Sequence, residues 1–221
     1  MNARPAGLVV ELLGAPGTGK SGLARALSEL DGVTVVKDHQ RGDLSTLAWS
    51  LARSWPVAVA PPHDVDRRRW AAWAGRVTAA SQIADARFAS GARTVVFDQG
   101  AAYTLVRMMQ VRSRPHGNVW WWSRCLETAG LLDLLVILDA DNDVLARRLR
   151  TRSKEHEADT MESPTLGDYL ARERRACHEV ADVLAREGAD VRRIITTDTT
   201  VDEQVDIVRE ALERHHAAPA G

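Results

Sequence analysis

The sequence of 221 residues has few cysteines, few lysines and no long hydrophobic run. Its two cysteines, Cys125 and Cys177, form no disulfide or metal-binding pattern, so we expect a reducing, cytoplasmic environment. No apolar run approaches the roughly 20 residues that a membrane span needs, and the first residues show no signal-peptide pattern. A formal net charge of −1 removes the general electrostatic attraction to nucleic acid. We therefore expect neither a membrane nor a nucleic acid as a partner.

Short apolar strands alternate along the chain with helical segments. The expected strands lie at 7–13, 33–36, 94–97, 132–138 and 191–195. The clearest expected helices lie at 20–30, 44–55, 65–90, 143–151, 166–187 and 201–215. Strands that are apolar throughout are typical of a parallel sheet covered by helices on both faces. The length suits one α/β domain over residues 1–216, followed by a short tail at 217–221.

A glycine-rich segment after the first strand matches the phosphate-binding pattern G-x-x-x-x-G-K-[ST] at every fixed position. From average composition, a chance match in a chain of this length is about 1%. Glycines let successive backbone N–H groups point at phosphate oxygens, and the following helix N-terminus adds partial positive charge. We predict that Lys20 reaches the β- and γ-phosphates and that the Ser21 hydroxyl binds Mg²⁺. The predicted nucleotide-binding loop, a Walker A motif, is Gly14, Ala15, Pro16, Gly17, Thr18, Gly19, Lys20 and Ser21.

The remaining motifs distinguish a hydrolase from a transferase. A GTPase would carry an Asn/Thr-Lys-x-Asp tetrapeptide, which this sequence lacks. An AAA-type ATPase has an apolar strand that ends in Asp-Glu, whereas Gln99 follows Asp98 and Ala140 follows Asp139. The missing glutamate after Asp98, and again after Asp139, favours phosphoryl transfer to a bound acceptor. A P-loop ATPase and a non-catalytic nucleotide-binding regulatory protein remain the alternatives.

An arginine-rich segment follows the fourth strand. Arg148 and Arg152 lie four residues apart, on one face of a helix, and a polar stretch without periodicity continues to Pro164. Cations at this position suit a solvated helix C-terminus. They also suit a lid over about 148–164 that places positive charge on the transferred phosphoryl group. Both interpretations stay open on the sequence alone.

With these motifs the chain resembles the P-loop nucleoside and nucleotide kinases, in particular the deoxynucleoside kinase and thymidylate kinase group. The resemblance covers most of the chain, and it includes the loop at 14–21, Asp38 after the second strand, Phe97-Asp98, the lid pattern at 148–157 and Thr196-Thr197-Asp198. It implies a three-layer fold with a five-stranded parallel sheet of order 2-3-1-4-5. It also implies ATP as the donor, with Mg²⁺.

The resemblance further implies roles for individual residues. Asp38 would be the base or the hydroxyl ligand of the acceptor, and Asp98 would belong to the Mg²⁺ and active-site network. Arg148 and Arg152 would hold phosphates. With Lys20, these are the candidate catalytic residues, and Ser21 and Asp98 are the candidate metal ligands. The chain departs from the family where Gln99 replaces an arginine, and Arg107 is a candidate substitute.

All seven tryptophans lie between Trp49 and Trp122, inside the expected acceptor-binding region of about 38–125. Three of them are consecutive, at 120–122, and point in three directions on a helix. At least one should therefore be exposed, either in the pocket or at a homodimer contact.

The segment Arg67-Arg68-Arg69 is either a solvated helix start or an anion site for an acidic acceptor. We predict a kinase whose acceptor is a nucleoside, a nucleotide or a related hydroxyl compound.

Overall fold

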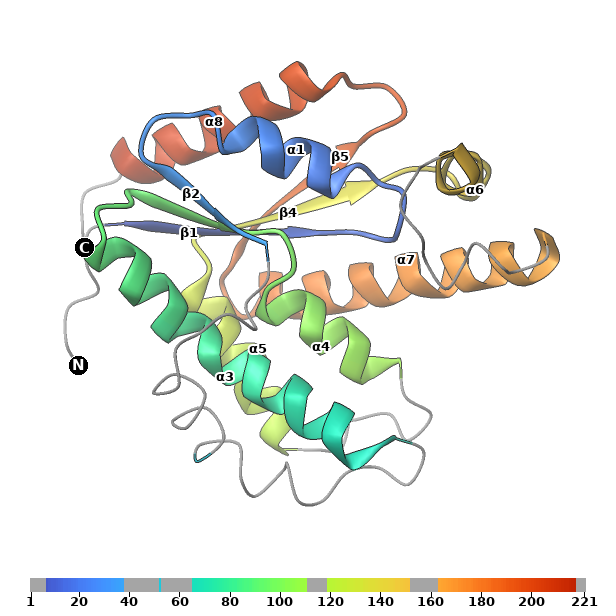
Figure 1. Ribbon diagram of the computed structural model, residues 1–221, viewed down its shortest axis with the longest axis horizontal. Helices are drawn as coiled ribbons and strands as arrows, with labels where there is room; N and C mark the ends of the chain where they lie inside the picture. The colour runs from blue at the N-terminus through green and yellow to red at the C-terminus, as the bar shows by residue number, and fades with distance from the viewer. Residues whose placement is uncertain (1–6, 38–51, 53–64, 111–118, 152–162, 218–221) are drawn as a thin grey trace.

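The computed structural model describes residues 7–37, 52, 65–110, 119–151 and 163–217. Within these ranges the strands form a single five-stranded sheet in the order β2-β3-β1-β4-β5. Every neighbouring pair is parallel. The strands are β1 (Leu8–Leu13), β2 (Val33–Val36), β3 (Thr94–Phe97), β4 (Leu134–Asp139) and β5 (Asp190–Ile195). The strand order implied by the family resemblance is confirmed (Figure 1).

Helices cover both faces of this sheet. Those in the described residues are α1 (Lys20–Leu27), α3 (Arg67–Ala89), α4 (Ala101–Met109), α5 (Val119–Leu131), α6 (Asn142–Thr151), α7 (Ser163–Arg186) and α8 (Val201–Ala217). Figure 1 shows α1 and α8 on one face of the sheet and α3, α4, α5 and α7 on the other, with α6 beside the end of β4. The three-layer α/β fold expected from the sequence is confirmed. No helix in the described ranges is long and apolar enough to span a bilayer.

Alternating side chains of the central strands divide the core into two layers. On β1, Val9 and Leu13 pack with the α3, α4, α5 and α7 side, which also contains Trp70 and Trp121. Val10 and Leu12 pack with α1 and α8. Because both faces are buried, β1, β3 and β4 are apolar along nearly their whole length.

Helix boundaries differ from expectation at a few positions. Helix α1 ends at Leu27, earlier than residue 30, with Ser28 as its C-cap. Helix α7 begins at Ser163, so Pro164 belongs to its first turn rather than to the preceding loop. Proline is favoured there because the first helical N–H groups have no intrahelical partner. The helix expected at 44–55 lies outside the described residues, apart from residue 52.

The parallel arrangement brings the ends of the strands to one edge of the sheet. The predicted phosphate-binding loop follows β1, and Asp98 follows β3, the neighbour of β1 on one side. Asp139 ends β4, the neighbour on the other side, and pairs in register with Ile195 of β5. In open parallel sheets, ligands bind at this carboxyl edge.

Candidate active site

The loop at 14–21 adopts the shape that the sequence motif predicts. Gly17 and Gly19 have positive φ angles of 87° and 94°, in a region that residues with a Cβ atom rarely enter. The Thr18 hydroxyl donates a hydrogen bond of 2.9 Å to the Ala15 carbonyl and closes the turn. Helix α1 begins immediately afterwards at Lys20. The loop therefore leads directly into a helix N-terminus, where backbone N–H groups are available to an anion.

The Lys20 side chain lies inside this loop. Its ammonium group donates to the carbonyl oxygens of Gly14 and Ala15, at 2.6 and 3.0 Å. Burial lowers the pKa of Lys20, and the negative charges of Asp98 and Glu173 oppose that shift. A phosphate bound in the loop would bring negative charge to this ammonium group. Its oxygens would then replace the two carbonyls as hydrogen-bond acceptors.

Ser21 and Asp98 contact each other across the gap between β1 and β3. The Ser21 hydroxyl donates to Oδ2 of Asp98 at 3.3 Å. The Asp98 side chain is buried, and its Oδ1 has no hydrogen-bond partner among the described residues. A buried carboxylate oxygen without a partner is costly unless a ligand or water completes it.

This pair fits the Mg²⁺ ion that the fold family implies. Mg²⁺ prefers oxygen ligands and is commonly held by one or two protein groups together with waters and substrate phosphates. Asp98 supplies an unpaired carboxylate oxygen, and Ser21 supplies a hydroxyl oxygen next to the phosphate-binding loop. In the described part of the chain no cluster of three or more His, Cys, Asp or Glu side chains could hold a metal by itself. The donor set therefore suits a metal that arrives with a phosphate.

Asp139, at the matching position of β4, is fully engaged by protein partners. Arg174 of α7 approaches both carboxylate oxygens, with Nε at 2.7 Å and Nη2 at 3.1 Å. His178, one turn further along α7, lies 2.9 Å from Oδ2. Burial would raise the pKa of Asp139, but the hydrogen bonds from Arg174 and His178 outweigh it and hold the pKa below its ordinary value. This aspartate connects β4 to α7 and has no oxygen left for a metal.

A third carboxylate, Glu11, is buried in the middle of β1. Its oxygens accept hydrogen bonds from the backbone N–H groups of Gly100, Ala102 and Tyr103, at 2.8 to 2.9 Å. These groups form the N-terminus of α4, whose cap residue Gly100 makes no side-chain cap of its own. Burial raises the pKa of Glu11 to about 7, although the backbone N–H groups oppose the shift. Glu11 therefore holds the turn that carries Asp98 and Gln99.

Arg148 is held at the end of β5. Its guanidinium donates to the Oγ1 and the backbone oxygen of Thr196, at 2.8 and 2.7 Å. The backbone N–H of Thr196 in turn donates to the carbonyl of Asp139 at 2.8 Å. Helix α6, which carries Arg148, also adjoins the phosphate-binding loop, because a Cβ atom at Gly17 would lie 3.1 Å from the Leu145 carbonyl. Arg148 thus joins α6 to the segment Thr196-Thr197-Asp198 after β5, which is part of the family resemblance.

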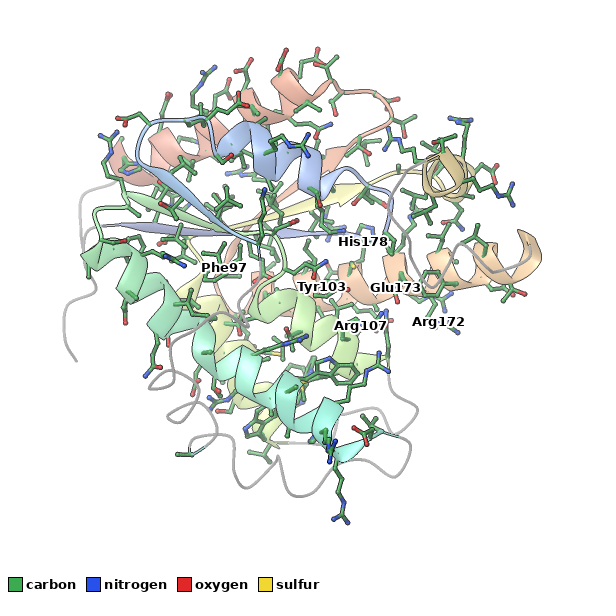
Figure 2. The ribbon with its side chains drawn as sticks, in the orientation of Figure 1. Phe97, Tyr103, Arg107, Arg172, Glu173 and His178 are labelled. Atoms are coloured by element: carbon green, nitrogen blue, oxygen red, sulfur yellow. The ribbon has the colours of Figure 1, made fainter. Side chains whose placement is uncertain are left out.

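A hollow of about 280 Å³ lies between α3 and α4 and is also lined by Gln99. Its described lining consists of Arg69, Ala72, Trp73, Arg76, Gln99, Tyr103 and Arg107. Gln99 directly follows Asp98, so the hollow adjoins the Ser21–Asp98 pair along the chain. Figure 2 shows Tyr103 and Arg107 of α4 near Glu173 of α7, and the Arg107–Glu173 distance is 3.2 Å. We call this hollow the α3–α4 pocket.

The tryptophans divide between core and surface. Trp70, Trp73 and Trp121 are buried, and the rings of the first two meet edge to face at 6.4 Å. Trp122 is 36% exposed, so the expectation that one of the three consecutive tryptophans is exposed is confirmed. Trp73 also lines the α3–α4 pocket. Trp49 and Trp55 lie outside the described residues.

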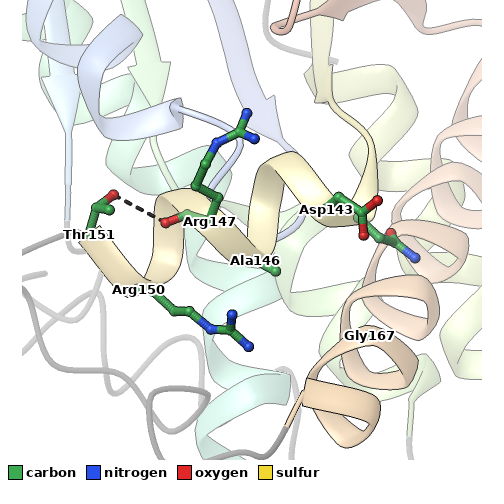
Figure 3. Close-up of a pocket in the computed structure, with 7 residues that line it drawn as sticks. Asp143, Ala146, Arg147, Arg150, Thr151 and Gly167 are labelled. Atoms are coloured by element: carbon green, nitrogen blue, oxygen red, sulfur yellow. Dashed lines mark hydrogen bonds between the residues drawn. The ribbon is translucent and has the colours of Figure 1, made fainter.

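A second hollow, of about 540 Å³, lies between α6 and the start of α7. Its described lining is Asn142, Asp143, Ala146, Arg147, Arg150, Thr151 and Gly167. Figure 3 shows Arg147 and Arg150 pointing in different directions from α6. None of the described lining residues belongs to the phosphate-binding loop or to the α3–α4 pocket.

The structure brings together Lys20, Ser21 and Asp98 of the predicted site. Asp38 and Arg152, the other two predicted catalytic residues, lie outside the described residues. Sequence reasoning did not single out Glu11, because an isolated acid in an apolar strand has no nearby partner in the sequence. Arg174 and His178 were also missed, although their spacing of four residues on one helix face was a usable signal.

The chain matches a known protein family over most of its length. The family model described as an AAA domain matches residues 10–164, from β1 through the loop, Asp98 and α6. No curated protein matches the chain significantly. The stretch shared with the family includes every predicted site residue.

Solved structures share the fold over nearly the whole chain. Deoxyadenosine kinase from M. mycoides with bound dCTP has a TM-score of 0.57 and 12% identity, over 94% of this chain and 100% of that one. The same kinase with bound dATP has a TM-score of 0.57 and 11% identity, over 93% and 100% of the two chains. YorR from Bacillus subtilis, in complex with phosphorylated GDP, has a TM-score of 0.59 and 16% identity, over 95% and 98%. At these identities the likeness establishes a common fold.

Proposed function

The chain belongs to the AAA domain family, and we propose that it binds ATP and transfers the γ-phosphoryl group to a small-molecule acceptor. The acceptor is a nucleoside, a nucleotide or a related hydroxyl compound. The observation that carries this proposal is the Ser21–Asp98 contact beside the phosphate-binding loop, with one buried Asp98 oxygen unpaired among the described residues. The fold shared with a deoxyadenosine kinase supports it.

In this proposal the loop at 14–21 binds ATP, the phosphoryl donor. Backbone N–H groups at 14–21 and the N-terminus of α1 hold the phosphates of ATP, and Lys20 stabilises the charge that develops on the transferred group. Ser21 and Asp98 would hold Mg²⁺, which supplies positive charge to the phosphate oxygens. Asp139 takes no part in this, because Arg174 and His178 occupy its oxygens.

In this proposal the α3–α4 pocket binds the acceptor, and Asp38 acts on its hydroxyl group. When the acceptor is a hydroxyl, its oxygen forms a bond to the γ-phosphorus while the bond from that phosphorus to the bridging oxygen breaks. The electron pair leaves with ADP, and the hydroxyl proton passes to a base, for which Asp38 is the candidate. In the adjoining pocket, Gln99 and Tyr103 offer polar groups to orient the acceptor.

The residue after Asp98 favours transfer over hydrolysis. Gln99 stands where a hydrolase of this kind would carry a water-activating glutamate, and it lines the pocket instead. Arg148, and Arg152 in the lid, are proposed to neutralise the phosphates of ATP. For Arg148 this requires exchange of its present hydrogen bonds to Thr196.

The test measures ADP release with and without a panel of nucleosides, nucleoside monophosphates and hydroxyl compounds. We expect release that depends on an acceptor, and we expect Lys20→Ala to lower it at least a hundredfold, since Lys20 acts on transition-state charge. Thermal unfolding of Lys20→Ala serves as the control for folding. Release that ignores acceptors would indicate an ATPase, and nucleotide binding without release would indicate a regulatory protein. Wild-type activity in Lys20→Ala would contradict the proposal.

A further inference from the structure

The α3–α4 pocket carries an unusual concentration of positive charge. Three of its seven described lining residues are arginines, Arg69 and Arg76 from α3 and Arg107 from α4. None of the described lining residues is an acid. A concave site with several converging guanidinium groups is suited to an anion, because arginine presents several donors in a planar fork.

Helix α3 presents its two pocket-lining arginines on one face. Arg69, Trp73 and Arg76 lie at positions i, i+4 and i+7, which share one side of a helix. The Arg69 guanidinium lies 5.0 Å from the centre of the Trp73 ring, so the ring supports it beside the pocket. Nε of Arg76 is buried and has no hydrogen-bond partner among the described residues. The helix therefore holds a buried donor at the wall of the pocket.

Among the described residues at the pocket, the charges leave a surplus of two cations. Glu173 of α7 lies 3.2 Å from Arg107 and offsets that cation. Within the described chain, neither Arg69 nor Arg76 forms an ion pair with a carboxylate. A phosphate monoester carries a charge of about −1.5 to −2 at neutral pH. The surplus thus matches one phosphate monoester.

We propose, on the basis of the proposed function, that the acceptor already carries a phosphate monoester, which Arg69 and Arg76 bind. A nucleoside monophosphate is an acceptor of this class, and an uncharged nucleoside is not. A volume of about 280 Å³ lies near the lower limit for small-molecule sites, so the pocket suits one compact acceptor.

The chemistry of transfer changes accordingly. A phosphate oxygen of the acceptor forms a bond to the γ-phosphorus of ATP, and the bond from that phosphorus to the bridging oxygen breaks. The electron pair of the broken bond leaves with ADP, and the product carries a diphosphate. A phosphate dianion has no proton to lose, so this step needs no general base. Asp38 is then dispensable as a base, and the arginines determine acceptor affinity.

The experiment compares nucleosides with their own 5′-monophosphates, and adds ribose 5-phosphate and inorganic phosphate as sources of the same anion. Acceptor-dependent ADP release is measured for the wild type, Arg69→Gln and Arg76→Gln. Arg87→Gln is the matched control, because Arg87 lies on the same helix, is exposed and is outside the pocket. Tryptophan fluorescence, with Trp73 in the pocket wall, gives a binding readout that does not need turnover.

We expect monophosphates to be preferred over the matching nucleosides. Arg69→Gln and Arg76→Gln should each raise KM for the monophosphate roughly ten- to a hundredfold, the cost of one charge-assisted hydrogen bond, with kcat less affected. Arg87→Gln should behave like the wild type. A preference for ribose 5-phosphate over nucleotides would keep the phosphate recognition and change only the rest of the acceptor.

Two outcomes overturn the inference. If nucleosides serve at least as well as their monophosphates, the acceptor is uncharged, while the proposed phosphotransferase function stands. If no compound stimulates ADP release, the proposed function fails, and fluorescence then decides the anion site separately. Monophosphate binding that Arg76→Gln weakens and Arg87→Gln leaves unchanged would support the site. Equal binding of nucleosides and monophosphates would refute it.

Discussion

Two aspartates at the same edge of the sheet, Asp98 after β3 and Asp139 at the end of β4, lie in different surroundings. Asp98 accepts one hydrogen bond, from Ser21, and keeps a buried oxygen without a partner among the described residues. Asp139 is bound by Arg174 and His178. The difference between them arises from α7, whose side chains reach β4. On this difference we propose a metal-binding role for Asp98 and a structural role for Asp139.

Exchanging each aspartate for asparagine separates the two roles. Asp98→Asn should lower phosphoryl transfer at least about a hundredfold and raise the Mg²⁺ concentration needed, with the free energy of unfolding changed by less than about 1 kcal/mol. Asp139→Asn should instead cost about 3 kcal/mol of stability, because it leaves Arg174 without its buried partner. Denaturant unfolding and Mg²⁺ titration of activity check both. If Asp98→Asn lost stability and Asp139→Asn lost activity, the two roles would have to be exchanged.

At the scale of the elements, helix α4 depends on a residue from a distant strand. Glu11 of β1 accepts hydrogen bonds from three N–H groups of the first turn of α4. The approach is so close that a Cβ atom at Gly100 would lie 2.6 Å from a Glu11 oxygen. Since α4 carries Tyr103 and Arg107, this contact also positions one wall of the α3–α4 pocket.

The raised pKa of Glu11 predicts a pH dependence of stability. Its pKa is about 7 in the folded chain and 4.5 as the ordinary value. A raised pKa favours the folded state most below pH 4.5, and this contribution is lost as pH rises to 7, by at most about 3 kcal/mol. In Glu11→Gln this fall should disappear. Unfolding free energies measured from pH 4.5 to 8 in both proteins test it, and parallel curves would contradict the assignment.

Helix α6 links the phosphate-binding loop to β5 through Arg148. Arg148→Ala should lower kcat more than it raises KM for ATP, because a cation near the phosphates acts mainly in the transition state. Arg147→Ala is the matched control, since Arg147 is exposed on the same helix. Steady-state kinetics with varied ATP distinguish the cases. If the kinetics of Arg148→Ala are unchanged, the role of this arginine is structural and consists of its hydrogen bonds to Thr196.

At the scale of the whole molecule, the sequence predicted the features that local pattern controls. Apolar strands and a glycine-rich turn before Lys20 indicated a parallel sheet and a loop that leads into a helix, and the structure confirms both. That this loop binds phosphate stays a prediction. The strand order came from the family resemblance. Helix α3 was predicted nearly to its ends, because Gly91, with φ of 98°, follows its C-cap.

Contacts between distant segments were beyond the reach of sequence pattern. Glu11 looks like a polar interruption of an apolar strand, since its partners lie 89 or more positions away. Arg69 and Arg76 form a charged pocket wall only because α4 packs against α3. Sequence spacing puts the arginines on one face of α3, whereas the tertiary fold determines what that face meets.

The central claim is that the terminal phosphoryl group of ATP passes to a bound small molecule. The most direct test follows a label on the γ-phosphate during incubation with nucleosides and nucleoside monophosphates. We predict that the label appears in a phosphorylated acceptor, and that Lys20→Ala abolishes this transfer. Label released as inorganic phosphate at the same rate with and without acceptors, or label that stays in ATP, would contradict the claim.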